Sequence, residues 1–121
     1  SDLMNFKLEI SNVSEILSDL FRENSRKLSI DDIQSQDSKH FNINFADLCS
    51  KSRSRSVSRP RQVAMYLCKE LTELSYPEIG KYFGGKDHAT VIHGVNKIKN
   101  LSLSDKKIQR DLENLISNLN S

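Results

Sequence analysis

The 121-residue sequence has few of the features that mark metal proteins or membrane proteins. It contains two cysteines, Cys49 and Cys68, whose separation fits no metal-binding pattern. No apolar run approaches the roughly 20 residues that a membrane span needs. The stretch 3–10 is too short and too polar for a signal peptide. Free thiols suit a reducing cytosol, so we expect a cytoplasmic protein.

Signatures of catalysis are missing as well. The sequence has neither a phosphate-binding loop nor a nucleophile elbow. Asp87 and His88 are adjacent, which is a poor geometry for one to orient the other. His88 and His93 would diverge by about 140° around a helix, so they should not share a metal ion. We therefore expect no enzyme activity, no metal and no cofactor in this chain.

Charge is unevenly distributed, although the formal net charge is only +2. Residues 1–50 hold 5 Lys/Arg and 9 Asp/Glu, a net of −4, whereas residues 51–121 hold 13 and 7, a net of +6. The stretch 51–69 alone has 6 basic residues and no acidic one. This asymmetry indicates a polyanionic partner for the second part of the chain. A solvated basic face is the alternative interpretation.

Apolar residues recur at helical spacing along most of the chain. The sequence has no internal repeats, and its one strand-like stretch, residues 6–10, is short. We expect an all-α fold: a compact bundle of six to seven helices that contains a helix-turn-helix, preceded by an amphipathic linker helix. Helices are predicted over about residues 13–21, 30–41 and 45–49, in a long central segment, on both sides of a glycine pair, and after residue 104.

Short polar residues predict where several helices begin. Ser29 and Ser75 each stand three residues before an acidic residue, as in a capping box. Asp87 would cap the helix after the glycine pair, and Ser104 would cap the last helix. Asp37 breaks the pattern, because it lies one turn after Ile33 where an apolar residue is expected. It either faces a polar partner such as an arginine or lowers stability.

Residues 51–61 have no apolar period and predict a Ser/Arg loop. Pro60 would then fit the first turn of the central helix, whose apolar face includes Val63 and Leu67. Arginines on a flexible segment suit the narrow, electronegative minor groove of DNA.

The stretch from Gly84 to His93 joins two helical patterns and has the outline of a helix-turn-helix. Gly84 would end the first helix in the left-handed conformation. His88 can donate to or accept from a base edge, while Ala89 and the Thr90 methyl can contact a thymine methyl. Asp87 could cap the helix, accept from a cytosine amino group, or do both.

These residues strongly resemble the C-terminal DNA-binding domain of the bacterial chromosomal replication initiator DnaA family. The resemblance is carried by residues 54–67, 75–80 and 83–93 and covers about residues 28–120. It implies that residues 1–27 are the tail of an ATPase domain and a linker helix, and that residues 28–121 are the DNA-binding domain. Because the sequence begins without Met, we expect it to be part of a longer protein. ATP or ADP is implied only for the missing ATPase domain.

The resemblance also implies double-stranded DNA as the partner, in the form of DnaA boxes at the replication origin. The recognition helix would enter the major groove and the basic loop the minor groove. Minor-groove contact is implied for Arg53, with Ser54 or Arg55 nearby, and base reading in the major groove for Asp87, His88, Ala89 and Thr90. Backbone contacts are implied for Arg61, Gln62, Lys69, Tyr76, Pro77, Lys86 and His93, with a base as a further option for Arg61.

Two residues depart from the family pattern. Ala89 stands where many members have Thr, so a methyl contact survives and a hydroxyl hydrogen bond does not. Lys86 replaces a frequent Arg, which keeps the charge and loses the bidentate fork.

Other interpretations stay open from the sequence. The fragment is expected to be monomeric, and the full-length protein to assemble on DNA. The helix at 13–21 would be a linker, a protein contact or a site near acidic phospholipid, although its acidic residues weigh against the lipid. Rival functions are a protein-binding module whose basic loop takes an acidic partner, and a general RNA- or DNA-coating domain.

Overall fold

The computed structural model describes residues 29–120, which form six α-helices and no strand. This confirms the expected all-α fold for the described part of the chain. The predicted strand-like stretch and linker helix lie outside the described residues. No described helix is long and apolar enough to cross a membrane. The helices are α3 (Ile30–Phe41), α4 (Phe45–Leu48), α5 (Arg55–Leu71), α6 (Tyr76–Tyr82), α7 (His88–Leu101) and α8 (Lys106–Asn120).

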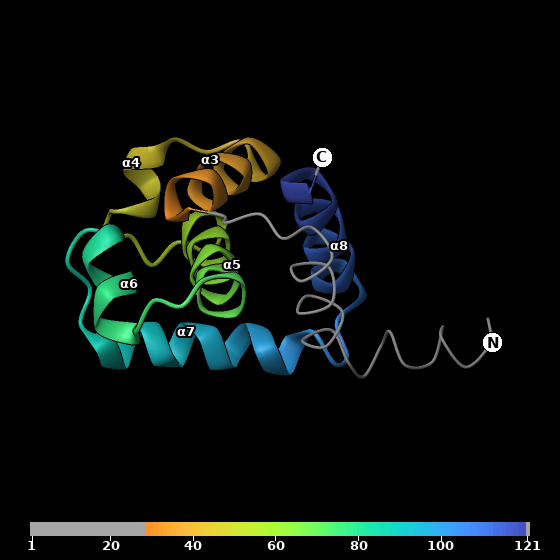
Figure 1. Cartoon of the computed structure of the whole chain (residues 1–121). Helices are drawn as coiled ribbons and strands as arrows, with labels where there is room; N and C mark the ends of the chain where they lie inside the picture. The colour runs from red at the N-terminus through yellow and green to blue at the C-terminus, as the bar shows by residue number, and fades with distance from the viewer. Residues whose placement is uncertain (1–28, 121) are drawn as a thin grey trace.

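Helix α5 is the centre of the bundle (Figure 1). Helices α3 and α4 lie above it in that view, α7 crosses below it, and α6 stands to the left. Every side chain from Val63 to Cys68 is at most 1% exposed, so this part of α5 is enclosed on all sides. The sequence predicted one apolar face, but a helix surrounded by neighbours buries its whole circumference. Helix α8 closes the core by packing against α3 and α7.

The caps of three helices are as predicted, and the last one differs. Ser29 and Ser75 each form a complete capping box, and Asp87 caps α7. The prediction that Ser104 caps α8 was wrong. The backbone N–H groups of Lys107 and Ile108 donate to Asp105 Oδ1 at 2.9 and 3.1 Å. A carboxylate suits this position because the positive end of the helix dipole favours negative charge.

The start of α5 was also predicted wrongly. The helix begins at Arg55, and Ser54 accepts hydrogen bonds from the amides of residues 57 and 58. Pro60 therefore lies in the second turn rather than the first. Its missing N–H leaves the carbonyl of Ser56 without that donor. Ser56 is exposed, so water can satisfy the carbonyl and the helix tolerates the proline.

Asp37 is fully buried on α3, and neither carboxyl oxygen has a hydrogen-bond partner. Another acid, Asp111 on α8, does have partners: it accepts from His40 Nε2 at 2.8 Å and from Lys107 Nζ at 3.2 Å. Burial, and then the negative charge of Asp111, raise the pKa of Asp37 well above its usual value. Of the two alternatives from the sequence, the structure supports a cost in stability.

Replacing Asp37 with Val should stabilise the domain. An unpaired buried polar group costs about 1–3 kcal/mol, so Asp37→Val is expected to raise the free energy of unfolding at pH 7 by about that amount. Because the folded pKa is raised, the native state holds a proton that the unfolded state releases, and wild-type stability falls as pH rises from about 4.

Denaturant unfolding at several pH values measures this effect. The gain from Asp37→Val should be largest at neutral pH and should shrink as the pH falls below about 4, where the carboxyl is protonated in the unfolded state as well. Asp37→Asn is the matched control, because it removes the titration and keeps a buried polar group. A Val variant that is less stable than wild type at pH 7 would contradict the account.

Candidate nucleic-acid interface

A glycine turn connects α6 to α7 and sets the angle between them. Gly84 and Gly85 both have positive φ, 83° and 78°, as predicted for Gly84. The carbonyl of Gly80 accepts from the amides of Phe83, Gly85 and Lys86 at 3.0–3.1 Å. A single acceptor thus satisfies three donors as the chain reverses. The residues form a helix, a tight turn and a second helix, which is the predicted helix-turn-helix.

The turn lies against the C-terminal end of α4. A Cβ on Gly84 would collide with the Cys49 carbonyl oxygen, whereas a Cβ on Gly85 would meet no atom within 4 Å. Gly80 is equally constrained, because its Cβ would collide with the Lys86 carbonyl. Glycine is therefore needed at 84 for two reasons, its backbone conformation and the close approach to α4.

The first turn of α7 presents polar and small side chains outward. Asp87 Oδ1 accepts from the Thr90 amide at 2.9 Å, and hydrogen bonds from Thr90 hold the pKa of Asp87 below its usual value. His88, Ala89 and Thr90 are all exposed. Asp87 is therefore an ionised cap, and the three residues after it are available to a ligand in front of the helix.

The two faces of α7 have different environments. Val91, Val95 and Ile98 are buried against the core, while His93 is exposed one turn after the tip. Gly94 faces Gln62 of α5, whose Cγ would lie 3.2 Å from a Cβ at that position. Gln62 is half-buried at this crossing of α5 and α7. Glycine at position 94 therefore allows α7 to pack closely against α5 beside Gln62.

Lys69 and Tyr76 come together from different helices. The ammonium of Lys69 lies 4.5 Å from the centre of the Tyr76 ring, and it also donates to the Leu74 carbonyl at 3.5 Å. Such a cation–π contact holds a lysine side chain in one position. Pro77, beside Tyr76 in the first turn of α6, is exposed. The three residues form a small surface next to the start of α6.

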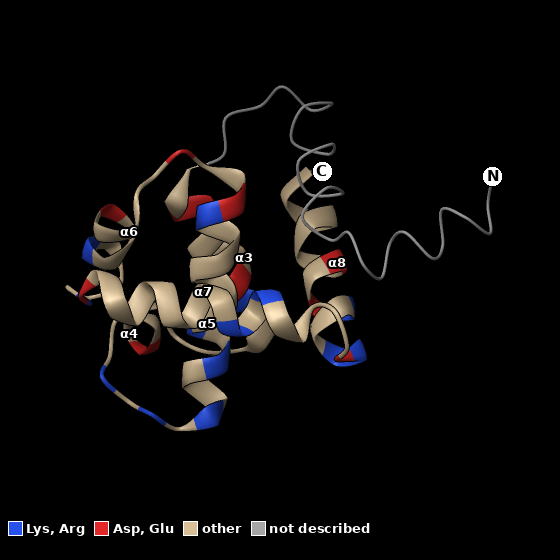
Figure 2. Cartoon of the chain, turned by 90° about the horizontal axis from the view of Figure 1, so that it is seen from below, with Lys and Arg blue, Asp and Glu red and all other residues tan. Residues whose placement is uncertain are grey.

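The basic loop is shorter than predicted. Residues 51–54, which we call the basic arm, precede α5, and Lys51 and Arg53 in the arm are exposed. Ser54 is the N-cap residue of α5, and its hydroxyl lies 3.0 Å from that of Ser56. Arg55 is exposed on the first turn of the helix. Figure 2 shows the arm and the N-terminal end of α7 toward the same, left side of the view.

Arg61 and Lys86 differ from the other predicted contacts because they are held by the protein. Arg61 is 8% exposed, and its Nη2 donates to the Ser52 carbonyl at 2.8 Å. Lys86 Nζ donates to the carbonyls of Cys49 and Phe83 at 3.2 and 2.9 Å. Burial lowers the pKa of both side chains. Their contacts with a DNA backbone stay predictions.

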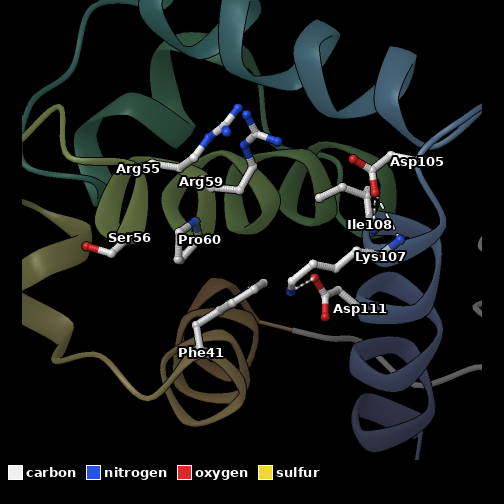
Figure 3. Close-up of a pocket in the computed structure, with 9 residues that line it drawn as sticks. All are labelled: Phe41, Arg55, Ser56, Arg59, Pro60, Asp105, Lys107, Ile108 and Asp111. Carbon is white, nitrogen blue, oxygen red and sulfur yellow. Dashed lines mark hydrogen bonds and ion pairs between the residues drawn. The ribbon is translucent and has the colours of Figure 1, made fainter.

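Arg59 is a basic residue of this region that the sequence analysis did not select. It lies one turn after Arg55, and burial and then the charge of Arg55 lower its pKa. Figure 3 shows both side chains on α5 at the edge of a pocket of about 410 Å³, which is also lined by Lys107 of α8 and by Asp105 just before that helix. Because residues 51–61 have no apolar period, nothing in the sequence indicated that Arg55 and Arg59 lie one turn apart on a helix.

Within residues 29–120, no three His, Cys, Asp or Glu side chains are grouped as a metal site would require. The described part of the chain presents surface groups suited to recognition: exposed polar side chains at the tip of α7, a basic arm, and a lysine held over a tyrosine ring. These are the groups that DNA-binding proteins use for base edges and phosphates.

Comparison with known proteins agrees with this arrangement. A family model described as "Bacterial dnaA protein helix-turn-helix" matches residues 30–98. The chain belongs to this family. It is 44% identical over 115 residues to the chromosomal replication initiator protein DnaA of Ruegeria pomeroyi. The aligned region covers 95% of the chain and 25% of the relative. For the protein of the same name from Ehrlichia ruminantium, identity is 45% over 119 residues, 98% of the chain and 25% of the relative.

The chain spans about a quarter of the length of these relatives. The matched region begins at the start of α3 and includes α6, the turn and nearly all of α7. The resemblance inferred from the sequence is thereby confirmed. The roles of individual residues stay predictions, because the comparisons concern the family and not single contacts.

The two turn glycines make a matched pair for testing the packing against α4. Gly85→Ala should cost about 1–2 kcal/mol of stability, since only its positive φ is unfavourable for alanine. Gly84→Ala should cost about 1–3 kcal/mol more, because the new methyl must displace the Cys49 backbone. Equilibrium unfolding in urea gives both values, and equal losses would show that this close approach is unimportant.

Proposed function

We propose that the chain is a sequence-specific double-stranded DNA-binding domain that binds DnaA boxes at a bacterial replication origin. The tip of α7 would enter the major groove and the basic arm an adjacent minor groove. The observation that carries this proposal is that two elements far apart in sequence lie toward the same side of the view in Figure 2. One is the N-terminal end of α7, which has the exposed residues His88, Ala89 and Thr90, and the other is the basic arm, which has the exposed Arg53.

Physical reasons support each contact. Free amides at the tip of α7 favour a phosphate, and His88 has donor and acceptor nitrogens for a base edge. Ala89 offers a methyl to thymine. Arg53 carries its charge on an exposed, non-helical segment, which suits a narrow minor groove. Contacts with the DNA backbone are proposed for Gln62, Lys69, Tyr76, Pro77 and His93, and the cation–π contact between Lys69 and Tyr76 would hold that lysine in place.

The wider role follows from the family and is part of the same proposal. The chain would serve initiation and regulation of chromosome replication in the cytoplasm, bound to the nucleoid. It would have no enzyme activity and no cofactor of its own, and nucleotide would bind to an ATPase domain elsewhere in a longer protein. The isolated chain would be monomeric, with self-assembly and any contact with acidic phospholipid depending on other segments.

A gel-shift panel with box and scrambled duplexes tests the function. Specific binding should exceed binding to scrambled DNA by at least about 10³-fold at physiological salt. Equal affinity for the two duplexes would contradict the proposal and favour a general nucleic-acid-coating domain. Absence of binding to either would favour a module that takes an acidic protein partner.

Two substitutions should separate base reading from backbone binding. His88→Ala is expected to cost about 1–3 kcal/mol on the box and to flatten the sequence preference. Lys69→Ala should weaken all duplexes alike and make the salt dependence shallower by about one unit of slope. Titrations at several salt concentrations measure both effects. Unchanged box selectivity in His88→Ala would show that the reading residues are assigned wrongly.

A further inference from the structure

The segment from Cys49 to Ser52 touches both elements of the proposed interface. It follows α4 directly and includes Lys51 and Ser52, the first two residues of the basic arm, so its last residue is the neighbour of Arg53. Its first residue, Cys49, is the C-cap of α4 and lies against Gly84 of the turn before α7. The two DNA-reading elements, which are about thirty residues apart in sequence, therefore share one short piece of backbone.

Lys86 connects this segment to the turn. Its ammonium donates to the carbonyls of Cys49 and Phe83, which are the C-cap residues of α4 and α6. Carbonyls at helix ends lack intrahelical donors, so a cation placed between two of them satisfies both. Lys86 itself is the second residue before α7. One side chain thus joins the end of α4, the end of α6 and the start of the recognition helix.

Arg61 connects the same segment to the central helix. Its Nη2 donates to the Ser52 carbonyl at 2.8 Å and to the Ser50 hydroxyl at 3.4 Å. The Ser50 hydroxyl also accepts from the Ser52 amide at 3.3 Å and donates to the Asp47 carbonyl at 2.9 Å. Burial, and then the positive charge of Arg61, lower the pKa of Lys86.

We propose that Arg61 and Lys86 are positioning residues that couple the two grooves. With Cys49–Ser52 they form a brace that fixes the basic arm relative to the tip of α7, so that Arg53 reaches the minor groove only when α7 is seated in the major groove. The oxygens that accept from Arg61 and Lys86 in the brace are carbonyl and hydroxyl oxygens, which carry no charge. Because these acceptors are uncharged, Arg61 and Lys86 keep their positive charges beneath the basic arm.

This inference rests on the proposed function and differs from a simple phosphate contact. A lysine that only binds phosphate contributes equally to every duplex. A lysine that positions Arg53 contributes more to duplexes that Arg53 can read. The two roles can be distinguished because the minor grooves of G·C and A·T differ by the guanine N2 amine. Inosine lacks that amine, so an I·C pair keeps the major groove of G·C and the minor groove of A·T.

The experiment uses the whole 121-residue chain and box duplexes that carry I·C or G·C at the pair contacted by the arm. To locate that pair, each G·C pair of the box is replaced in turn by I·C. The pair sought is the one where wild type binds I·C more tightly than G·C and Arg53→Ala does not. In Lys86→Met, which keeps the aliphatic stem and loses the donors, the I·C preference should fall by at least about threefold. Lys86→Arg keeps the hydrogen-bond donors and the charge, so its preference for I·C should stay close to that of wild type. Lys81→Met removes an exposed lysine of α6 and should leave the preference unchanged.

A double-mutant cycle gives a second reading of the coupling. Arg53→Ala combined with Lys86→Met should bind I·C at least about twofold more tightly than the product of the two single losses predicts. Additive losses, or an equal loss by Lys86→Met on both duplexes, would overturn the coupling and leave Lys86 as a phosphate contact. Thermal unfolding confirms that each variant is folded.

Hydrogen exchange of the free chain tests the brace apart from DNA. Amides of residues 50–54 should exchange faster in Lys86→Met than in wild type or Lys81→Met. The reason is that the Cys49 carbonyl, at the start of the segment, loses its hydrogen bond from Lys86. Unchanged exchange would contradict the brace whatever the DNA result. Faster exchange in a protein that does not prefer box DNA would contradict the proposed function and not the brace.

Discussion

The backbone of the glycine turn lies so close to the Cys49 carbonyl that residue 84 has no room for a Cβ. This contact joins the helix-turn-helix to α4, and α4 leads directly into the basic arm. The direction of α7 relative to the arm therefore depends on one backbone approach. Lys86 reinforces it with hydrogen bonds to the ends of α4 and α6, and the Gly80 carbonyl closes the turn from the other side.

The central helix provides the rigid base for these elements. Residues of α5 between Val63 and Cys68 are enclosed by neighbouring helices, so α5 cannot shift without opening the core. The same helix carries Arg55 at its exposed start, Arg61 beneath the arm and Lys69 beside Tyr76. A rigid helix that carries contacts along its length suits recognition of a duplex, in which base edges and phosphates have fixed spacing.

The sequence predicted most of the fold because local signals agreed with the packing. Ser29, Ser75 and Asp87 cap helices where their chemistry indicated. The start of α5 was missed because the Ser/Arg run has no apolar period, so nothing local shows that it is helical. The brace was equally hidden. Its acceptors are backbone carbonyls, which every residue has, and only the tertiary structure shows that Arg61 and Lys86 point at them.

Footprinting of a bound box duplex, resolved by groove, tests the central claim most directly. Methylation of guanine N7 reports on the major groove, and methylation of adenine N3 reports on the minor groove. The account predicts protection of N7 positions under the tip of α7 and of N3 positions in an adjacent minor groove under the arm, on one face of the duplex. Protection confined to one groove, or spread evenly over the duplex, would contradict recognition by two fixed elements.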